Sequence, residues 1–212
     1  MAERAIAVAV SGGIDSLVAA HLLTQAGHSV FGIHFTTGHE PLPESGLAHL
    51  QKQLGIPVHT VDLKAAFQQK VIDYFTRTYA SGRTPNPCLA CNPAIKFGRL
   101  LEIARNKGAG YLATGHYARI VRDAQGRRRL LKGIDATKDQ SYFLAFLEQE
   151  QLAAARFPLG EMTKEQVRNT ARSAGLTPAR RKESQDVCFI PEDYPAFLAA
   201  QPGFASEPGC IE

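Results

Sequence analysis

The stretch that decides the fold is Ala5-Ile-Ala-Val-Ala-Val-Ser-Gly-Gly-Ile-Asp-Ser16, near the start of the chain. Its first six residues form a continuous apolar run, which is typical of a strand buried on both faces of a parallel sheet. Ser11-Gly-Gly13 then interrupts the run, and the segment from Asp15 to Ala26 has the pattern of a helix that ends at Gly27. The stretch therefore predicts a strand, a glycine-rich turn and a helix, the opening unit of an α/β fold.

Strand-like and helix-like segments alternate through most of the remaining chain. The expected strands cover 29–35, 58–61 and 111–114, and the expected helices cover 46–54, 64–80, 94–107, 141–155 and 163–174. A loop is expected over 82–93, and a β-hairpin is expected over 117–122 and 127–133. This order predicts a doubly wound parallel sheet with a β-hairpin and a small helical C-terminal region. We expect a nucleotide-binding domain over 1–135 and a helical extension over 136–212.

Length and composition exclude several classes of protein. A chain of 212 residues and 23.0 kDa fits one α/β domain, and 44% hydrophobic with 21% charged residues excludes wholesale disorder. No stretch reaches the roughly 18 apolar residues of a membrane helix, and the first residues do not form a secretion signal. Cys88, Cys91, Cys188 and Cys210 are too few and too irregularly spaced for a secreted disulfide scaffold. We therefore expect a cytoplasmic protein that does not bind membranes.

Positive charge is concentrated in one part of the chain, from Arg119 to Lys138, which we call the basic stripe. It holds seven basic residues against two acidic ones, whereas the net charge of the whole chain is only +4. Such a stripe fits a polyanionic partner such as nucleic acid. The alternative is a solvated hairpin that only keeps the protein soluble, and charge alone leaves both interpretations open.

The glycine-rich turn at 11–16 has the composition of a phosphate site. Backbone amides of such a turn, together with the N-terminus of the following helix, bind phosphate, and Ser11 and Ser16 add hydroxyl donors. The sequence contains neither the lysine-bearing mononucleotide loop nor the Gly-x-Gly-x-x-Gly dinucleotide motif. The alternative is a plain strand-to-helix turn in which Asp15 only starts the helix. Ser-Gly-Gly-x-Asp-Ser resembles the pyrophosphate-binding loop of ATP pyrophosphatases, which cleave ATP to AMP and pyrophosphate.

A second group of reactive residues lies between Thr84 and Gly98. Cys88 and Cys91 form a Cys-x-x-Cys pair in a proline-containing segment, and Cys188 follows much later in the chain. This spacing is typical of metal ligands or of redox thiols. A zinc ribbon needs a second close pair, which the remaining cysteines do not supply. Structural zinc, inert core thiols and sulfur transfer, with or without an iron–sulfur cluster, all stay open.

Five motifs in order give the chain a specific resemblance. They are Ser11–Ser16, Thr84–Gly98, Ala113-Thr-Gly-His-Tyr-Ala-Arg119, Lys138-Asp-Gln-Ser-Tyr-Phe-Leu144 and Ser184-Gln-Asp-Val-Cys-Phe-Ile190. Together they resemble the tRNA-specific 2-thiouridylase family of the ATP-pyrophosphatase (PP-loop) superfamily, and they cover nearly the whole chain. The resemblance implies an adenine-nucleotide α-hydrolase-like fold. It also implies an enzyme that uses ATP to replace the 2-oxygen of the wobble uridine of tRNA with sulfur.

The resemblance implies roles for individual residues. ATP would be bound by the glycine-rich turn and its neighbours: Ala9, Val10, Ser11, Gly12, Gly13, Ile14, Asp15, Ser16, Phe35 and Gly115. The tRNA would be contacted from three of the motifs, by Asn86, Pro87, Cys88, His116, Lys138, Asp139 and Gln140. Cys91 would be the catalytic cysteine and Cys188 the carrier of a persulfide. Mg²⁺ would accompany ATP, and sulfur would come from sulfide or from a persulfide carrier.

The chain departs from the family pattern in three ways. Cys88 stands where the family usually has aspartate, there is no Trp, and the chain stops at Glu212 where the family continues into a central domain and a C-terminal β-barrel. A third thiol favours a [4Fe–4S] cluster with Cys88, Cys91 and Cys188 as catalytic ligands, because three thiolates leave one iron open for exogenous sulfide. The alternative is the persulfide route, in which Cys91 and Cys188 are the catalytic pair.

Two other functions stay open. The first is an ATP pyrophosphatase that forms an amide or thiolates a small molecule, against which the basic stripe and Lys138–Gln140 argue. The second is a tRNA-binding module with reduced catalysis, against which the intact Ser11–Ser16 motif argues. A further expectation concerns apolar residues that follow Gln140, which we place in the core rather than in contact with bases: Tyr142, Phe143, Phe146 and Leu147.

Overall fold

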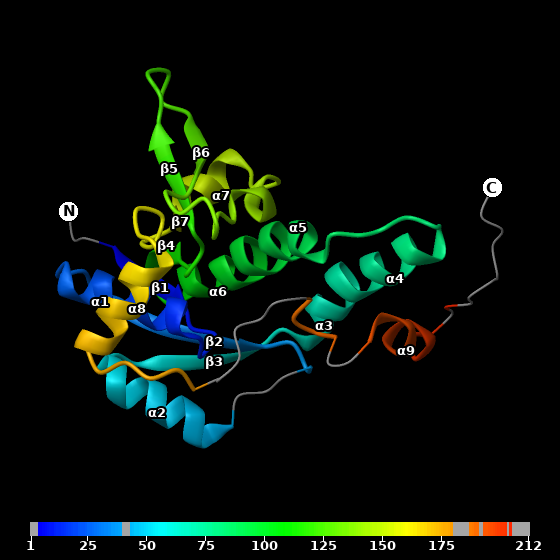
Figure 1. Ribbon diagram of the computed structural model, residues 1–212, viewed down its shortest axis with the longest axis horizontal. Coiled ribbons are helices and arrows are strands. Elements are labelled where there is room, and N and C mark those ends of the chain that lie inside the picture. Colours follow the sequence, from blue (N-terminus) through cyan, green and yellow to red (C-terminus); the bar gives the residue numbers. More distant parts are fainter. Residues whose placement is uncertain (1–3, 40–42, 180–186, 191–192, 203, 205–212) are drawn as a thin grey trace.

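The computed structural model of the chain describes residues 4–39, 43–179, 187–190, 193–202 and 204. Its main sheet has five parallel strands in the order β3-β2-β1-β4-β7 (Figure 1). The bounds are Ala5–Ala9 for β1, Val30–Thr36 for β2, Val58–Asp62 for β3, Ala109–Ala113 for β4 and Ala155–Arg156 for β7. This architecture confirms the predicted doubly wound parallel sheet.

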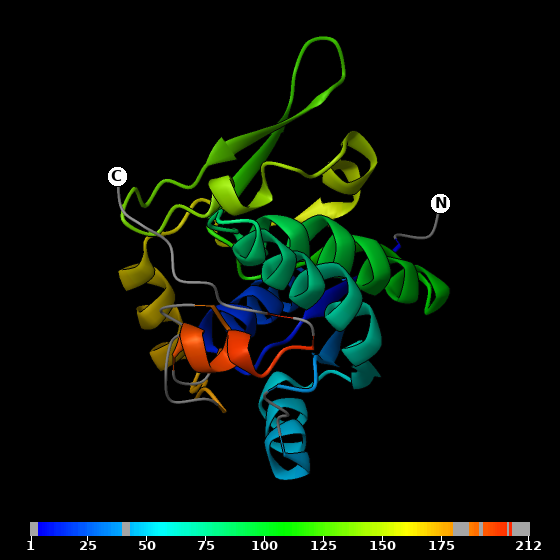
Figure 2. The ribbon, with the colours of Figure 1, turned by 90° about the vertical axis from the view of Figure 1, so that its right-hand side faces the viewer.

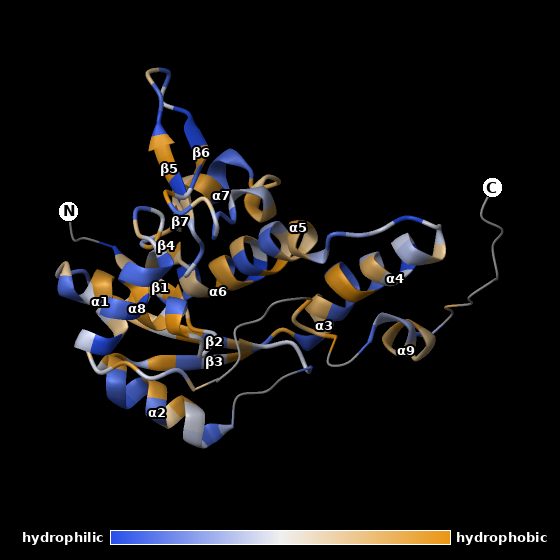
Figure 3. Cartoon of the chain, in the orientation of Figure 1, coloured by the Kyte–Doolittle hydropathy of each residue, from blue (hydrophilic) through white to orange (hydrophobic). Residues whose placement is uncertain are grey.

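Strand β1 is the central strand because its side chains are apolar on both faces. Ala7 and Ala9 belong to one hydrophobic cluster, whereas Ile6, Val8 and Val10 belong to the cluster on the opposite face. Successive side chains of a strand point to opposite faces, so a continuous apolar run is what a doubly covered strand requires. Figure 3 shows the resulting concentration of apolar residues along β1 and the neighbouring helices.

Helices cover both faces of the sheet (Figure 2). One cluster contains buried residues of α1 (Ile14–Gln25), α2 (Glu44–Leu54) and α8 (Lys164–Ser173). The other face carries a longer helical series, made up of α3 (Lys64–Phe67), η1 (Gln68–Ile72), α4 (Asp73–Ala80), α5 (Pro87–Cys91), η2 (Asn92–Leu100) and α6 (Leu101–Asn106). A last helix, α9 (Tyr194–Ala199), packs on this second cluster through Leu198.

The helix that carries two of the thiols begins earlier than the sequence predicts. The loop predicted over 82–93 is wrong from Pro87 onward, where α5 starts. The Asn86 side-chain oxygen accepts hydrogen bonds from the N–H groups of Cys88 at 3.1 Å and Leu89 at 3.4 Å, so Asn86 is the N-cap. Pro87 occupies the first helical position, where its missing N–H costs nothing. Cys88 and Cys91 therefore stand on a helix.

Two π-helical segments interrupt the predicted regular helices. The η1 segment divides the helix expected over 64–80, and η2 follows α5 directly. Pro93 lies in η2 and has no N–H for a regular helical bond, which favours a locally widened turn. Gly98 packs so closely on this turn that an added Cβ would lie 2.7 Å from the carbonyl oxygen of Pro93. Such π-helical turns often mark functional sites.

The predicted β-hairpin is present. It consists of β5 (Ala118–Arg122) and β6 (Arg128–Lys132), which pair in antiparallel fashion apart from the main sheet. The Asp123 carboxylate closes the turn, since it accepts hydrogen bonds from the Arg127 N–H at 2.9 Å and from Arg129 Nε at 2.8 Å. The hairpin projects from the body of the molecule and carries most of the basic stripe (Figure 1).

The helix predicted over 141–155 is wrong. The chain instead forms a 3-10 turn η3 (Ser141–Leu144), a short helix α7 (Gln149–Ala154) and then strand β7. The Asp139 carboxylate accepts hydrogen bonds from the N–H and Oγ of Ser141, which favours a tight turn at this point. A separate capping box between Glu148 and Gln151 starts α7.

The expectation that the apolar residues of this segment are core is also wrong for two of them. Tyr142 is 62% exposed and Phe146 is 65% exposed, whereas Leu147 is buried and Phe143 is half-buried. The predicted helix would have directed these side chains inward, but the irregular backbone directs only part of them there.

The described elements after residue 136 join the main sheet or the helices that cover it. Strand β7 pairs with β4, and α8 packs on α1. A capping box of Thr163 and Gln166 starts α8, with the Thr163 side chain accepting from the Gln166 N–H. Where one domain ends and the next begins stays a prediction. In the part of the chain that the structure describes, no helix is both long enough and apolar enough to span a membrane.

Candidate active site

The order of the strands reverses between β1 and β4. From β1 the chain runs to β2 and β3 on one side, and then crosses to β4 on the other. In open α/β sheets, ligands bind outside the carboxyl ends of the strands at such a point. Ser11–Ser16 follows β1 and Thr114–Tyr117 follows β4, so two predicted site segments meet at this edge.

Hydrogen bonds between its two serines shape the turn after β1. Ser16 Oγ donates to the Gly13 carbonyl at 2.8 Å and accepts from the Ser11 N–H at 3.2 Å. Gly12 has a φ of +85°, which favours glycine. Gly13 is the N-cap of the 12-residue helix α1 and makes no side-chain capping bond. The backbone amides of this helix start therefore have the arrangement that binds phosphate, so the predicted ATP residues fit a nucleotide phosphate.

Gly115 brings the end of β4 against the start of α1. A Cβ on Gly115 would lie 2.8 Å from the Asp15 carbonyl carbon and 2.9 Å from the Ser16 nitrogen. Real Cβ atoms do not approach backbone so closely, so the two segments can touch only because residue 115 is glycine. Phe35, also predicted to contact ATP, lies near the carboxyl end of β2 and is partly buried. Ala9 and Val10 are buried at the end of β1 and support the turn from below.

The Asp15 carboxylate is held by two residues to which the sequence analysis assigned no role, Lys164 and Tyr117. Lys164 Nζ lies 2.8 Å and 2.9 Å from its two oxygens, and the Tyr117 hydroxyl donates to it at 2.8 Å. Lys164 is only 6% exposed although it is a lysine, and buried lysines are rare unless paired. Its link to Asp15 spans 149 residues, so no short pattern contains both partners. The one sequence feature that could have pointed to Lys164 is its position directly after Thr163, the N-cap of α8.

Two cysteine thiols lie on α5, the helix that Asn86 starts. Asn92, which is 1% exposed, donates from its amide nitrogen to the Cys88 carbonyl at 3.0 Å and to the Phe143 carbonyl at 2.8 Å. Asn92 thus fastens the thiol helix to the segment that follows Gln140. Burial raises the pKa of Cys88, and the charge of Lys96 opposes this effect.

Cys91 is the more strongly perturbed thiol. Burial raises the pKa of Cys91 to about 12, with smaller contributions from the neighbouring thiols Cys188 and Cys88, whereas Lys96 lowers it. Cys91 is therefore a protonated thiol at neutral pH in this conformation. Lys96 is the cation that opposes this state, and the sequence motifs assigned it no role. It follows Cys91 by five residues, which is the hydrogen-bond spacing of a π-helix.

His116 connects the thiol helix with the nucleotide edge of the sheet. Its Nδ1 lies 2.7 Å from Thr114 Oγ1, and its Nε2 lies 3.4 Å from Lys96 Nζ. Burial lowers the pKa of His116 well below its ordinary value, and the charge of Lys96 lowers it further. His116 is therefore neutral at pH 7. With Nε2 accepting from the Lys96 ammonium, the proton is on Nδ1 and points to Thr114.

Cys188 is exposed, and its neighbour Phe189 anchors it. The Phe189 ring packs on Phe67 and Phe75 at centroid distances of 5.6 Å and 5.3 Å, on the second cluster of the core. Cys91 packs on the same cluster as Phe189, and Cys188 raises the pKa of Cys91 slightly. Cys210 lies outside the described residues.

Among the residues that the structure describes, no group of three His, Cys, Asp or Glu side chains has the geometry to hold a metal ion. A [4Fe–4S] cluster binds each thiolate through a different iron, so its ligands are spaced more widely than those of one ion, and the ligand set Cys88, Cys91 and Cys188 stays a prediction. The chemistry of the described site is that of two partly buried thiols, one exposed thiol and a nearby ammonium.

The Lys138–Gln140 motif is built into the protein by its own hydrogen bonds. Gln140 Oε1 accepts from the Tyr117 N–H at 3.1 Å, and the Asp139 carboxylate accepts from the Gly133 N–H at 3.0 Å. Burial alone would raise the pKa of Asp139, but these hydrogen bonds and those of Ser141 outweigh it and lower the pKa. The motif thus joins the hairpin to the segment of His116.

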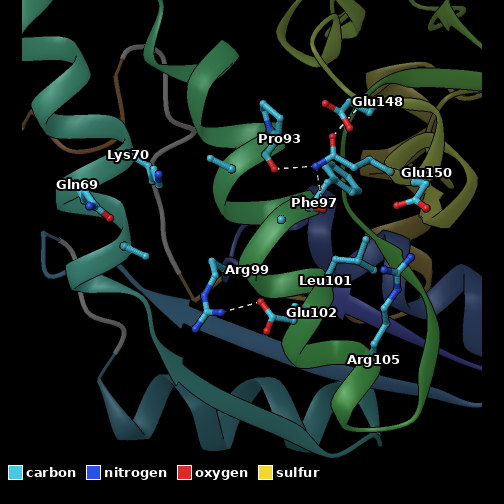
Figure 4. A pocket seen from close by; sticks show the side chains of 14 residues that line it. Gln69, Lys70, Pro93, Phe97, Arg99, Leu101, Glu102, Arg105, Glu148 and Glu150 are labelled. Atoms are coloured by element: carbon cyan, nitrogen blue, oxygen red, sulfur yellow. Dashed lines mark hydrogen bonds and ion pairs between the residues drawn. The ribbon is translucent and has the colours of Figure 1, made fainter.

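A groove of about 550 Å³ lies elsewhere, between η1, η2, α6 and α7 (Figure 4). Its walls are lined by Arg99 and Glu102, which form an ion pair at 2.7 Å, and by Gln151, which donates to the Pro93 carbonyl at 2.8 Å. None of the predicted site residues lines it. The groove is therefore separate from the candidate active site.

We expect iodoacetamide to alkylate Cys188 much faster than Cys91 at pH 8. A thiol with a pKa of about 12 is ionised in only about one molecule in ten thousand at that pH, and the thiolate is the nucleophile. The rate at Cys91 should rise about tenfold per pH unit between pH 8 and 10, and Lys96→Met should slow it further. Peptide mass spectrometry after timed alkylation measures both rates, and equal rates at pH 8 would contradict the raised pKa of Cys91.

Comparison with known proteins places the chain. The family model described as tRNA methyl transferase HUP domain matches residues 4–192. The tRNA-specific 2-thiouridylase MnmA of Desulfosudis oleivorans is 56% identical over 98% of this chain and 58% of that relative. The enzyme of the same name from Syntrophotalea carbinolica is 48% identical over 99% of this chain and 62% of that relative. The chain thus spans about three fifths of the length of these curated relatives.

Two solved structures share the fold at low sequence identity. A predicted subunit of tRNA methyltransferase from Methanocaldococcus jannaschii has a TM-score of 0.51 and 20% identity, over 80% of this chain and 76% of that chain. NMN synthetase from Francisella tularensis has a TM-score of 0.51 and 16% identity, over 83% of this chain and 63% of that chain. With the family match over residues 4–192, the chain belongs to the tRNA methyl transferase HUP domain family, and its relatives confirm the resemblance to tRNA-specific 2-thiouridylases.

Proposed function

We propose that this chain catalyses ATP-dependent 2-thiolation of a uridine in tRNA. The observation that carries the proposal is a connection between the nucleotide turn and the thiols, made by two close contacts and one charge effect. Asp15 touches Gly115, the next residue His116 lies 3.4 Å from Lys96, and Lys96 lowers the pKa of Cys91. The names of the relatives supply the substrate class, and they do not favour a small-molecule ATP pyrophosphatase.

ATP would first activate the base. The 2-oxygen of uracil is a poor leaving group, and its attack on the α-phosphorus of ATP forms an O–P bond and releases pyrophosphate. Residues 9–16, Phe35 and Gly115 would hold the nucleotide, with its phosphates at the start of α1. Mg²⁺ would offset the phosphate charge. Asp15 is the one carboxylate of the turn, and we assign it to position Mg²⁺ at the phosphates.

Sulfur transfer would use the exposed thiol of Cys188 and the thiol of Cys91 in turn. The terminal sulfur of a persulfide on Cys188 bonds to carbon 2 of the activated uracil, and AMP leaves with the former 2-oxygen. The Cys91 sulfur then attacks the inner sulfur of Cys188 and forms a Cys91–Cys188 disulfide. The electron pair of the broken S–S bond stays with the sulfur on carbon 2, and the Cys91 proton ends on N3 of the thiolated base. An external thiol reduces this disulfide, and a persulfide donor reloads Cys188. The electrostatic effect of Cys188 on the pKa of Cys91 supports this route, because the two thiols must come together to form the disulfide.

The persulfide route replaces the cluster as the favoured mechanism. It needs only the two thiols of Cys91 and Cys188, whereas a [4Fe–4S] cluster needs Cys88 as a third ligand, with each thiolate on a different iron. Iron and acid-labile sulfide analysis of anaerobically prepared protein separates the two. We expect thiolation by iron-free protein with a persulfide donor, and a requirement for about four irons per chain would return the assignment to the cluster.

The basic stripe supplies the second prediction of the proposal. If it contacts RNA phosphates, the logarithm of the tRNA binding constant should fall with the logarithm of salt concentration, by about 0.7 to 0.9 per contact. Changing Arg127, Arg128 and Arg129 together to Ala should flatten this slope. Fluorescence anisotropy at several salt concentrations measures it.

A matched control removes equal charge elsewhere. Lys52, Arg105 and Lys107 are exposed and lie outside the basic stripe, so their replacement by Ala removes three positive charges without touching the hairpin. This control should leave the slope within about 0.5 of the parent value. Equal slopes for both triple variants would return the stripe to the interpretation of a solvated hairpin.

A further inference from the structure

Tyr142 and Phe146 are the two most exposed large apolar side chains in the described part of the chain. Their exposed fractions are 62% and 65%; Tyr142 lies in η3, and Phe146 lies between η3 and α7. Single exposed apolar residues are common and need no explanation. Two aromatic rings exposed within five residues of one segment are unusual, because apolar surface that stays in water contributes no free energy of burial to folding.

This aromatic segment is fastened in place at both sides. The Phe143 carbonyl accepts from the Asn92 amide at 2.8 Å, and the Tyr142 ring packs on the Phe143 ring at 5.9 Å with an interplanar angle of 70°. On the other side, the Gln149 side chain accepts from the Arg128 N–H and donates to the Arg128 carbonyl, both at 2.9 Å. The rings are therefore exposed on an ordered backbone.

The neighbours of the segment indicate what covers it. Strand β6, with Arg128, Arg129 and Lys132, lies on one side, and the thiol helix α5 lies on the other. The turn η3, which carries Tyr142, contacts both β6 and α5, so a polyanion that binds the basic stripe and also reaches the thiols would meet this segment. Nucleic acids combine negative phosphates with flat apolar bases, so the charge and the aromatic surface fit the same partner.

We infer that Tyr142 and Phe146 form a stacking platform for unpaired bases of the RNA loop that presents the target uridine. This inference rests on the proposed function and adds the form of RNA that the site takes. A uridine whose 2-oxygen must reach both ATP and a thiol has to leave its stack, and its neighbours then need new stacking partners. The platform favours a single-stranded loop over a duplex, in which every base face is covered.

The first test uses substitutions that separate aromatic stacking from simple apolar contact. Tyr142→Leu and Phe146→Leu should each weaken binding of an RNA hairpin with an unpaired loop by about fivefold or more, whereas Tyr142→Phe should bind as the parent does. The salt slope should stay unchanged, because stacking releases no counterions. Binding of a fully paired duplex should not change. Both side chains are exposed, so an unchanged unfolding temperature confirms that the variants fold.

The second test uses the absence of tryptophan from the sequence. Phe146→Trp places a single indole on the platform, and Ala48→Trp places one on the exposed surface of α2, at the opposite end of the molecule from the hairpin (Figure 1). RNA should quench the fluorescence of Phe146→Trp with the same midpoint as the anisotropy titration, and it should leave Ala48→Trp unquenched.

The outcomes separate the platform from the proposed function. If the parent chain binds and thiolates RNA but the leucine variants bind as the parent does, the platform is wrong and the function stands. If leucine preserves binding and only alanine weakens it, the stacking platform is overturned in favour of a general apolar contact, for example with another protein segment. If the parent chain binds no RNA, both proposals are wrong.

Discussion

Asp15→Asn should lower ATP-dependent thiolation by at least about 100-fold, because the carboxylate can act on the ATP phosphates only through a cation, and loss of one group that positions a cation at a reacting phosphate costs about this much. Asparagine keeps the shape of the side chain but removes the negative charge that pairs with Lys164 and that would help to hold Mg²⁺ beside the ATP phosphates. The measurement is the release of AMP and pyrophosphate in the presence of tRNA. Full activity would refute the assignment of the turn as an ATP site.

Two controls separate this effect from loss of structure. Lys164→Met removes the same ion pair but keeps the Asp15 carboxylate, so both variants should lose a comparable free energy of unfolding, about 1 to 3 kcal/mol. Activity should fall less in Lys164→Met than in Asp15→Asn at a temperature where both are folded. Asp73→Asn, at a surface carboxylate on α4 that accepts a hydrogen bond from Gln68 at 3.0 Å, should leave activity unchanged. Equal losses in the first two variants would reduce Asp15 to a structural role.

Cys91→Ser should abolish sulfur transfer, because a serine oxygen cannot release the persulfide sulfur by forming a disulfide. Adenylation does not involve this thiol, so cleavage of ATP to AMP should continue in the variant. Cys188→Ser should show the same separation, and it should also lose the persulfide itself, which mass spectrometry of the intact protein detects. Cys88→Ala, which keeps both thiols of the catalytic pair, should stay within about tenfold of the parent.

Cys88→Ala and a further variant, Cys88→Asp, test the role of residue 88, where this chain has cysteine and the family usually has aspartate. A cluster mechanism predicts that Cys88→Ala loses activity as completely as Cys91→Ser, since each removes one of three iron ligands. The persulfide mechanism predicts that Cys88→Asp, which restores the residue usual in the family, keeps or raises activity. Loss of activity and of bound iron in Cys88→Ala would contradict the persulfide mechanism.

Local pattern was sufficient to predict most of the sheet. The apolar run of β1, the glycine-rich turn and the hairpin each follow from contiguous residues, and each is present as predicted. The start of α5 was missed although Asn86-Pro87 is a recognisable cap followed by proline at the first helical position. The helix predicted over 141–155 failed because a side chain outside the segment, Asp139, bonds into it and tightens the turn.

The sequence predicts only those parts of the site whose functional residues lie close together in the chain. Loop 11–16 and the Cys-x-x-Cys pair carry motifs, and both lie where an α/β fold places a site. Lys164 and Lys96 could not be found this way, since their roles come from contacts 149 and 20 residues distant in the chain. The exposure of Tyr142 and Phe146 also depended on the tertiary backbone, because aromatic residues at helical spacing normally indicate core.

The most direct test of tRNA thiolation by this chain is the product of one defined reaction. The 212-residue chain is incubated anaerobically with ATP, Mg²⁺, a persulfide donor and a tRNA whose wobble uridine is unmodified, and the digested nucleosides are analysed by mass spectrometry. We predict 2-thiouridine at that position, formed with one AMP and one pyrophosphate per sulfur and absent without ATP. Cleavage of ATP to ADP, or AMP formation that tRNA does not stimulate and that yields no thiolated nucleoside, would contradict the proposed function.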